Sequence, residues 1–113
     1  MHEYSIVQAL VARVEDLSRQ HRAQSVRRLV VKIGELAGVE TDLLATAYET
    51  FRERTCCEAA ELTILPVEAK WTCPQCGSPV PRAGVLRCNR CGEPARLVQG
   101  DEIVLERIEM EVA

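Results

Sequence analysis

Four cysteines stand in two matched pairs whose spacing is typical of a metal site. Each pair has the form Cys-x-x-Cys, with Cys73 and Cys76 in the first pair and Cys88 and Cys91 in the second. Four thiolates fill the tetrahedral shell that zinc prefers, so no coordination position remains open for water or a substrate. The sequence therefore predicts a closed zinc site that holds the chain together without doing chemistry.

Two other interpretations of these pairs stay open. A single Cys-x-x-Cys pair at the start of a helix is typical of thioredoxin-type redox proteins, but here a second pair is present and a glycine follows each pair. Four thiolates also bind iron in rubredoxin-like sites, and zinc is favoured by the expected compartment and by its frequency. The remaining cysteines, Cys56 and Cys57, extend neither pair and are interpreted as small buried apolar residues.

A second candidate metal site lies at the start of the chain. The imidazole of His2, its own deprotonated amide nitrogen and the α-amine of Met1 offer three nitrogen donors nearly in one plane. Such a set suits Ni(II) or Cu(II) in tetragonal geometry, and Glu3 adds a carboxylate as a ligand or as a hydrogen-bond acceptor. The site requires Met1 to be the retained first residue. Because it lies at an exposed end, we expect it to exchange its metal readily.

Length and charge limit the classes of protein to which the chain can belong. Its 113 residues suffice for one modest core, with a metal to support a short second lobe. No apolar run approaches a membrane span and the start lacks a secretory signal, so we expect a cytoplasmic protein without membrane contact. The net charge of −3 argues against nucleic-acid binding, although five basic residues and one acid lie between residues 70 and 97.

Two helices are predicted from apolar residues that recur at helical spacing. The first follows Ser5, which forms a predicted capping box with Gln8, and it ends near His21. The second has Thr41 or Asp42 as its predicted cap. Both patterns are apolar on one side only, so each helix is expected to cover a sheet.

Three strands are predicted, over residues 26–33, 61–67 and 103–112. Pro66 predicts that the second strand lies at a sheet edge or ends there, and a change of phase in the third predicts a bulge or twist near Glu106. The order of the elements indicates an α+β fold, in which two helices pack on a three-stranded sheet and a zinc-ribbon-like lobe is inserted between two strands.

The segment that carries the paired cysteines has little apolar sequence for a core of its own. Proline and glycine recur along it, so the backbone has turn chemistry throughout and zinc has to replace the missing core. We therefore expect two domains. Residues 1–67 plus 98–113 form the nickel-binding α+β domain, and residues 68–97 form the zinc-binding domain.

These motifs follow one another in a specific order along the chain. They are Met1-His2-Glu3, Ser5-Ile6, Val31-Lys32-Ile33-Gly34-Glu35-Leu36, Gly38-Val39-Glu40 and the two cysteine pairs. In this order, and in their place relative to both ends, they resemble the HypA/HybF family of hydrogenase nickel metallochaperones. The resemblance covers essentially the whole chain.

The resemblance implies a nickel carrier with a structural zinc ion. Nickel would bind at Met1-His2-Glu3, with His2 indispensable, and Glu40 would be the acidic residue that precedes the second helix. The nickel would pass to the large subunit of a [NiFe]-hydrogenase with a HypB-type GTPase as partner. Some members also serve urease, which adds urease maturation proteins to the expected partners. We expect a monomer or a weak homodimer.

The sequence contains no constellation of catalytic residues, so no enzyme activity is expected. It has two histidines and no phosphate loop, which leaves nucleotide hydrolysis to a partner. The main alternative is a zinc-ribbon adaptor for nucleic acid or transcription, motivated by Arg82, Arg87 and Arg90 in the metal loop. A third interpretation is a sensor from which mild oxidant ejects zinc. Glu3 and Glu40 are also candidate partner contacts.

Overall fold

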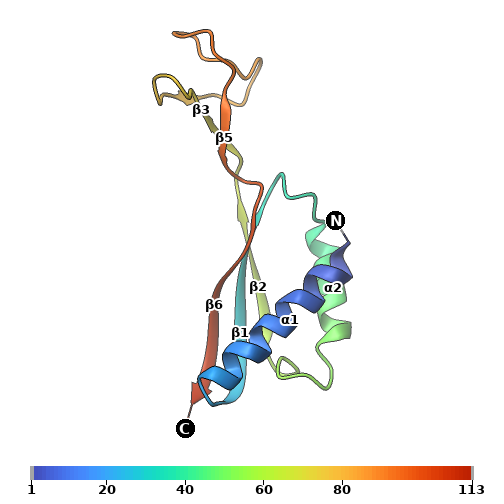
Figure 1. Ribbon diagram of the computed structural model, residues 1–113. Helices are drawn as coiled ribbons and strands as arrows, with labels where there is room; N and C mark the ends of the chain where they lie inside the picture. Colours follow the sequence, from blue (N-terminus) through green and yellow to red (C-terminus); the bar gives the residue numbers. More distant parts are fainter. Residues whose placement is uncertain (1, 113) are drawn as a thin grey trace.

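The computed structural model is elongated, with dimensions of 56 × 28 × 16 Å (Figure 1). The structure describes residues 2–112, and within that range the chain forms two helices and two small sheets. The helices are α1 (Glu3–Gln20) and α2 (Thr41–Phe51). The strands are β1 (Ala23–Gly34), β2 (Glu61–Val67), β3 (Lys70–Thr72), β4 (Pro79–Val80), β5 (Arg96–Gln99) and β6 (Ile103–Val112).

The larger sheet has the strand order β2-β1-β6, with β1 in the middle. β1 pairs in parallel with β2 and antiparallel with β6. A parallel pair needs a crossover connection, and α2 supplies it. β1 is rich in aliphatic and β-branched residues, as expected for a strand that is paired along both edges. These elements confirm the predicted α+β fold of two helices on a three-stranded sheet.

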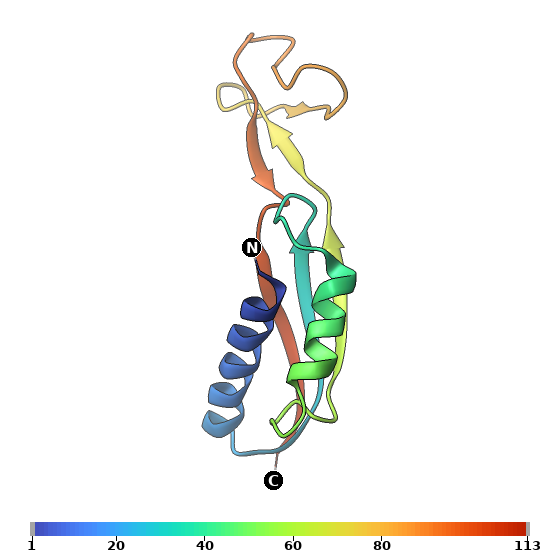
Figure 2. The same cartoon turned by 90° about the vertical axis from the view of Figure 1, so that its right-hand side faces the viewer.

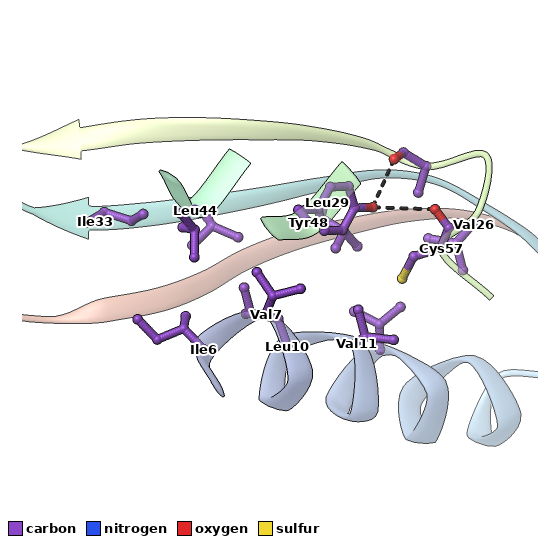
Figure 3. Close-up of a cluster of buried hydrophobic side chains, with 13 residues drawn as sticks. Ile6, Val7, Leu10, Val11, Val26, Leu29, Ile33, Leu44, Tyr48 and Cys57 are labelled. Carbon is purple, nitrogen blue, oxygen red and sulfur yellow. Dashed lines mark hydrogen bonds between the residues drawn. The ribbon is translucent and has the colours of Figure 1, made fainter. Parts of the chain in front are cut away.

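Both helices cover the same face of this sheet, and the main core lies between the two layers (Figures 2 and 3). Full burial of an aliphatic side chain contributes about 1.5–3 kcal/mol, so this layer contact is the chief source of stability. The buried core residues are Ile6, Val7, Leu10, Val11 and Val14 of α1, Val26, Leu29, Val31 and Ile33 of β1, Leu44 and Tyr48 of α2, and Cys57 and Ala60 after α2.

Tyr48 is the polar anchor of this core. Its hydroxyl donates to the carbonyl of Ala60 at 2.8 Å (Figure 3), and burial raises the pKa of Tyr48, so the hydroxyl keeps its proton. Arg52 donates from Nη1 to the same carbonyl, also at 2.8 Å. These bonds fix the loop between α2 and β2 against the core, because a buried carbonyl is costly to leave without a donor.

Both helices begin earlier than predicted. The N-cap of α1 is His2, whose carbonyl accepts the amide protons of Ser5 and Ile6 at 3.1 and 3.3 Å. The predicted capping box of Ser5 with Gln8 is therefore wrong, because Ser5 already lies in the first turn. The N-cap of α2 is Glu40 and not either of the two residues that follow it.

The predicted strands are confirmed, together with two local irregularities. Pro66 lies in β2, an edge strand, where the missing amide proton does least harm. Successive residues of β1 pair with Arg107 and then with Leu105, so Glu106 is the extra residue of a bulge in β6. The bulge changes the phase of β6 and lets apolar residues on both sides of it pack against the core.

The smaller sheet has the order β4-β3-β5 and lies at the far end of the molecule (Figures 1 and 2). We call residues 70–99 the metal lobe, and residues 2–67 with 103–112 the helical lobe. The predicted domain boundary after residue 97 falls inside β5, so the division into two independent domains stays a prediction. Neither helix of the described residues has the length and apolarity that a membrane crossing requires.

Backbone segments of both lobes cross at the joint between them. Gly34 ends β1 against the carbonyl of Gly100, and Gly100, with φ of 108°, lies in turn against Ala69. The amide of Gly34 donates to the carbonyl of Glu102 at 2.9 Å, and the amide of Leu36 donates to the carbonyl of Gly100 at 2.7 Å. A side chain at Gly34 would overlap backbone atoms, so the joint requires glycine there.

We expect Gly34→Ala to destabilise the zinc-loaded protein by about 1–3 kcal/mol, because the added methyl group overpacks against backbone that cannot rotate away. Gly38→Ala is the matched control. Gly38 has φ of 74° and open space around it, so its substitution costs only about 1–2 kcal/mol of backbone strain. Urea unfolding followed by circular dichroism measures both. A Gly34 variant that is as stable as the parent protein contradicts this description of the joint.

Candidate metal centre

The four paired cysteines meet at one point of the metal lobe. The sulfur atoms of Cys73, Cys76, Cys88 and Cys91 all lie within 4.8 Å of one another. Cys73 and Cys88 are buried, whereas Cys76 and Cys91 are exposed. The structure therefore brings together all four predicted ligands, with protein on one side of the cluster and solvent on the other.

Each cysteine pair folds as a tight turn of the same form. In the first turn, the amide of Cys73 donates to the carbonyl of Ser78 at 2.9 Å, and the amide of Gly77 donates to the carbonyl of Cys73 at 2.8 Å. The second turn repeats both bonds from Cys88 and Gly92, at 2.9 and 3.0 Å. The two glycines have φ of 73° and 69°, a left-handed conformation that glycine adopts without strain. The turns thereby aim their sulfurs at a common point.

The spacing of the sulfurs fits zinc. Zinc binds thiolate sulfur at about 2.3 Å, which places the sulfurs of a tetrahedral site about 3.8 Å apart. The Sγ atoms of Cys76 and Cys88 are 3.8 Å apart. The amide of Gln75 also donates to Sγ of Cys73 at 3.4 Å. With four sulfurs in place, a bound zinc ion would have no position left for a substrate.

The thiols of the cluster differ in how firmly they keep their protons. The hydrogen bond with Ser78 lowers the pKa of Cys76 to about 6, whereas the hydrogen bond with Cys76 raises the pKa of Cys91 to about 12. One thiolate is therefore favoured near neutral pH, and a further one is opposed by its neighbours. A dication stabilises every thiolate, so zinc binding would release protons and would weaken as the pH falls.

The apolar support around the sulfurs is small. Val80, Trp71 and Ala95 pack with the two buried cysteines and form a core separate from that of the helical lobe. The first cysteine pair lies in a turn after β3 and does not begin a helix. Redox dithiols obtain their low pKa at the start of a helix. The thioredoxin-type interpretation therefore has no support from this geometry.

The two unpaired cysteines lie in the helical lobe. Cys57 belongs to the main core and is fully buried, while Cys56 is partly buried beside it. Burial raises the pKa of Cys57 to about 12 and also raises the pKa of Cys56. Both thiols stay protonated at neutral pH, in agreement with their interpretation as small apolar residues.

Two of the arginines that motivated the nucleic-acid alternative have partners within the chain. Both Nη atoms of Arg82 donate to the carboxylate of Glu35, with 2.9 Å between Nη2 and Oε2. Arg87 donates from Nη1 to the carbonyl of Gly92 at 2.6 Å. These bonds take up donors that phosphate groups would need, so the alternative is weakened. Sequence reasoning missed the pair of Glu35 and Arg82, because 47 positions separate them.

The predicted nickel ligands lie at the starts of the two helices. His2 is the exposed N-cap of α1, Glu3 is the first residue of that helix, and Glu40 is the exposed N-cap of α2. Both helix starts lie at the end of the larger sheet that is nearer the metal lobe (Figures 1 and 2). Met1 lies outside the described residues. That these groups share one nickel ion stays a prediction.

The partial charges at the starts of α1 and α2 affect how favourably a cation can bind near them. The first amide groups of a helix have no partner within it, and they carry a partial positive charge. A cation is disfavoured there unless anionic ligands offset that charge. Glu3 and Glu40 place carboxylates at the starts of the two helices.

The fold and the sulfur cluster define a class of small α+β metal-binding proteins that carry a zinc-ribbon-like lobe on a helix-covered sheet. Within this class, a family model described as hydrogenase/urease nickel incorporation, metallochaperone, HypA matches residues 1–110. The chain belongs to the HypA family.

Relatives and solved structures agree with this assignment over the full length. The chain is 40% identical to the hydrogenase maturation factor HypA of Aquifex aeolicus, with 99% of each chain covered. It is 39% identical to that of Wolinella succinogenes, with 98% of this chain and 96% of the relative covered. The solution structure of the nickel metallochaperone HypA from Helicobacter pylori aligns over 100% of both chains, with a TM-score of 0.75 at 32% identity.

We expect Cys88→Ser to lower the zinc content from about one ion per chain to a small fraction of that, because three thiolates and a hydroxyl bind zinc poorly. Backbone NMR signals of the metal lobe should collapse while those of the helical lobe persist, since the two cores are separate. Cys56→Ser is the matched control and should keep its zinc. Undiminished zinc in the Cys88 variant, measured by mass spectrometry of the metal, would contradict the assigned ligand set.

Proposed function

We propose that the protein is a nickel metallochaperone that binds Ni(II) at the start of its chain and delivers it for the maturation of a [NiFe]-hydrogenase. The observation that carries this proposal is the family match, which spans both the opening residues and the cysteine cluster. The relatives named hydrogenase maturation factor cover nearly the whole chain. Delivery to urease is an extension of the proposal, supported by the wording of the family description.

We propose His2 as the principal nickel ligand, with Met1, Glu3 and Glu40 as further ligands or partner contacts. His2 is exposed, and its backbone amide precedes the first turn of α1 and so has no acceptor within the helix. An imidazole and a deprotonated amide are nitrogen donors that favour tetragonal Ni(II). If Met1 is the first residue of the mature chain, its α-amine would be the third nitrogen donor of the set.

Zinc at the four cysteines is the resident ion in this proposal. It supplies charge neutralisation and a crosslink when bound, whereas the cysteines themselves fix the turns through which the metal lobe folds. The ligand types of the two sites differ, since four sulfurs favour zinc and nitrogen with oxygen suits labile nickel. Each ion is thereby kept out of the other's place.

The proposed function is transfer, and it involves no catalysis by this chain. The partners would be a HypB-type GTPase, which hydrolyses the nucleotide, and the large subunit of the hydrogenase, which receives the nickel. Urease maturation proteins are partners in the extended proposal. A cytoplasmic monomer or weak homodimer fits this role, because it must meet each partner in turn.

We expect His2→Ala to weaken Ni(II) binding about 10-fold or more, because the substitution removes one donor and the chelate ring that it closes. An extension of two residues before Met1 should also weaken binding, since the α-amine becomes an amide. His21→Ala, at the other end of α1, is the matched control and should bind as the parent protein does. Isothermal titration calorimetry of untagged, zinc-loaded protein measures the affinities. Nickel binding that is indifferent to His2 would remove the basis of this proposal.

A further inference from the structure

One ion pair joins the two lobes close to their joint. The carboxylate of Glu35, directly after β1, accepts two hydrogen bonds from the guanidinium of Arg82 in the metal lobe. Oε1 of Glu35 also accepts the amide proton of Ala69 at 2.6 Å. The guanidinium of Arg82 lies 5.8 Å from the ring centroid of Trp71, which packs against the small core beside the cysteines. The contact therefore runs from β1 to the support of the cysteine cluster.

This contact adds to the backbone hydrogen bonds at the joint, and Nη1 of Arg82 also lies 3.9 Å from Oε1 of Glu68. The chain passes between the lobes at residues 68–69 and again at residues 100–102, and those links are backbone. The backbone bonds of the joint lie at residues 34–36 and 100–102, and the bidentate pair adds a tie of fixed geometry that reaches farther into the metal lobe. The hydrogen bonds from Arg82 and then from Ala69 lower the pKa of Glu35 to about 2, so the carboxylate stays charged at any physiological pH.

Glu35 also begins the loop that leads to the candidate nickel site. The loop covers residues 35–40 and ends at Glu40, the N-cap of α2. Its residues Ala37 and Val39 pack against the main core, and Ala37 lines the same groove as Ser5 in the first turn of α1. The position of Glu35 therefore influences the position of this loop, and the loop lies beside the first turn of α1, which follows His2.

We infer that Glu35 and Arg82 are positioning residues, which fix the metal lobe on the helical lobe and hold the loop at residues 35–40 in the form that presents Glu40 to nickel. This inference rests on the proposed function, because it concerns the same nickel site. The pair acts through the loop and touches no metal itself. Loss of the pair frees the orientation of the lobes and weakens nickel binding, while the zinc ligands stay complete.

The test compares Arg82→Ala and Glu35→Gln with the parent protein, all full length and zinc-loaded. Both side chains are partly exposed, at 48% and 36%, so the pair adds little to stability and the variants should fold. Arg27→Ala is the matched control, because Arg27 makes an exposed ion pair of 2.9 Å with Glu111 inside the helical lobe. Arg82→Lys keeps the charge but loses the bidentate geometry, so its values should be intermediate.

Residual dipolar couplings report the orientation of the lobes, and calorimetry with Ni(II) reports the affinity. We expect Arg82→Ala and Glu35→Gln to bind zinc at one ion per chain, to lose the common alignment of the two lobes, and to bind nickel about fivefold more weakly or worse. The control should match the parent in all three measurements.

Three results would overturn the inference. An unchanged alignment in both variants means that the pair does not fix the lobes. A changed alignment with unchanged nickel affinity means that the lobes are not linked to the nickel site, and the proposed function then stands alone. Nickel binding in the parent protein that does not depend on His2 removes the proposed function, and this inference with it.

Discussion

Four cysteine sulfurs have to meet at one point for the segment between β3 and β5 to keep a defined fold. That segment buries few apolar residues, and its two turns place their amides and glycines so that the sulfurs converge. Without a dication, neighbouring thiolates repel one another, and the hydrogen bond with Cys76 raises the pKa of Cys91. A zinc ion bound as proposed would act as the core of the metal lobe, next to which Trp71 packs.

The helical lobe obeys a different constraint, because burial of aliphatic side chains is enough to fold it. β1 is central to that lobe, since it pairs with β2 and β6 and supplies part of the core. The same strand ends at Gly34, where the backbone of the joint closes over it, and it leads directly into Glu35. One strand therefore connects the core, the joint and the loop to Glu40. The starts of both helices lie at the end of the larger sheet that is nearer the metal lobe (Figures 1 and 2).

Much of this arrangement could be predicted from local patterns in the sequence. Helical periodicity, strand alternation and the phase change at Glu106 are properties of short segments, and the structure confirms each of them. The cysteine cluster was predictable because zinc ligands keep a fixed spacing. The helix start at His2 was not, because the N-cap acts there through its carbonyl and leaves no side-chain signature. The pair of Glu35 and Arg82 and the contact of Gly34 with Gly100 join distant positions, and no local pattern reports them.

The central claim is that this chain separates two metals by ligand chemistry, with sulfur for a retained zinc ion and nitrogen with oxygen for a transferred nickel ion. X-ray absorption at the zinc and nickel edges of one sample, loaded with both metals, tests it most directly. The zinc edge should show four sulfur atoms at about 2.3 Å. The nickel edge should show nitrogen and oxygen neighbours with the multiple scattering of an imidazole ring. Sulfur in the nickel shell would contradict the claim.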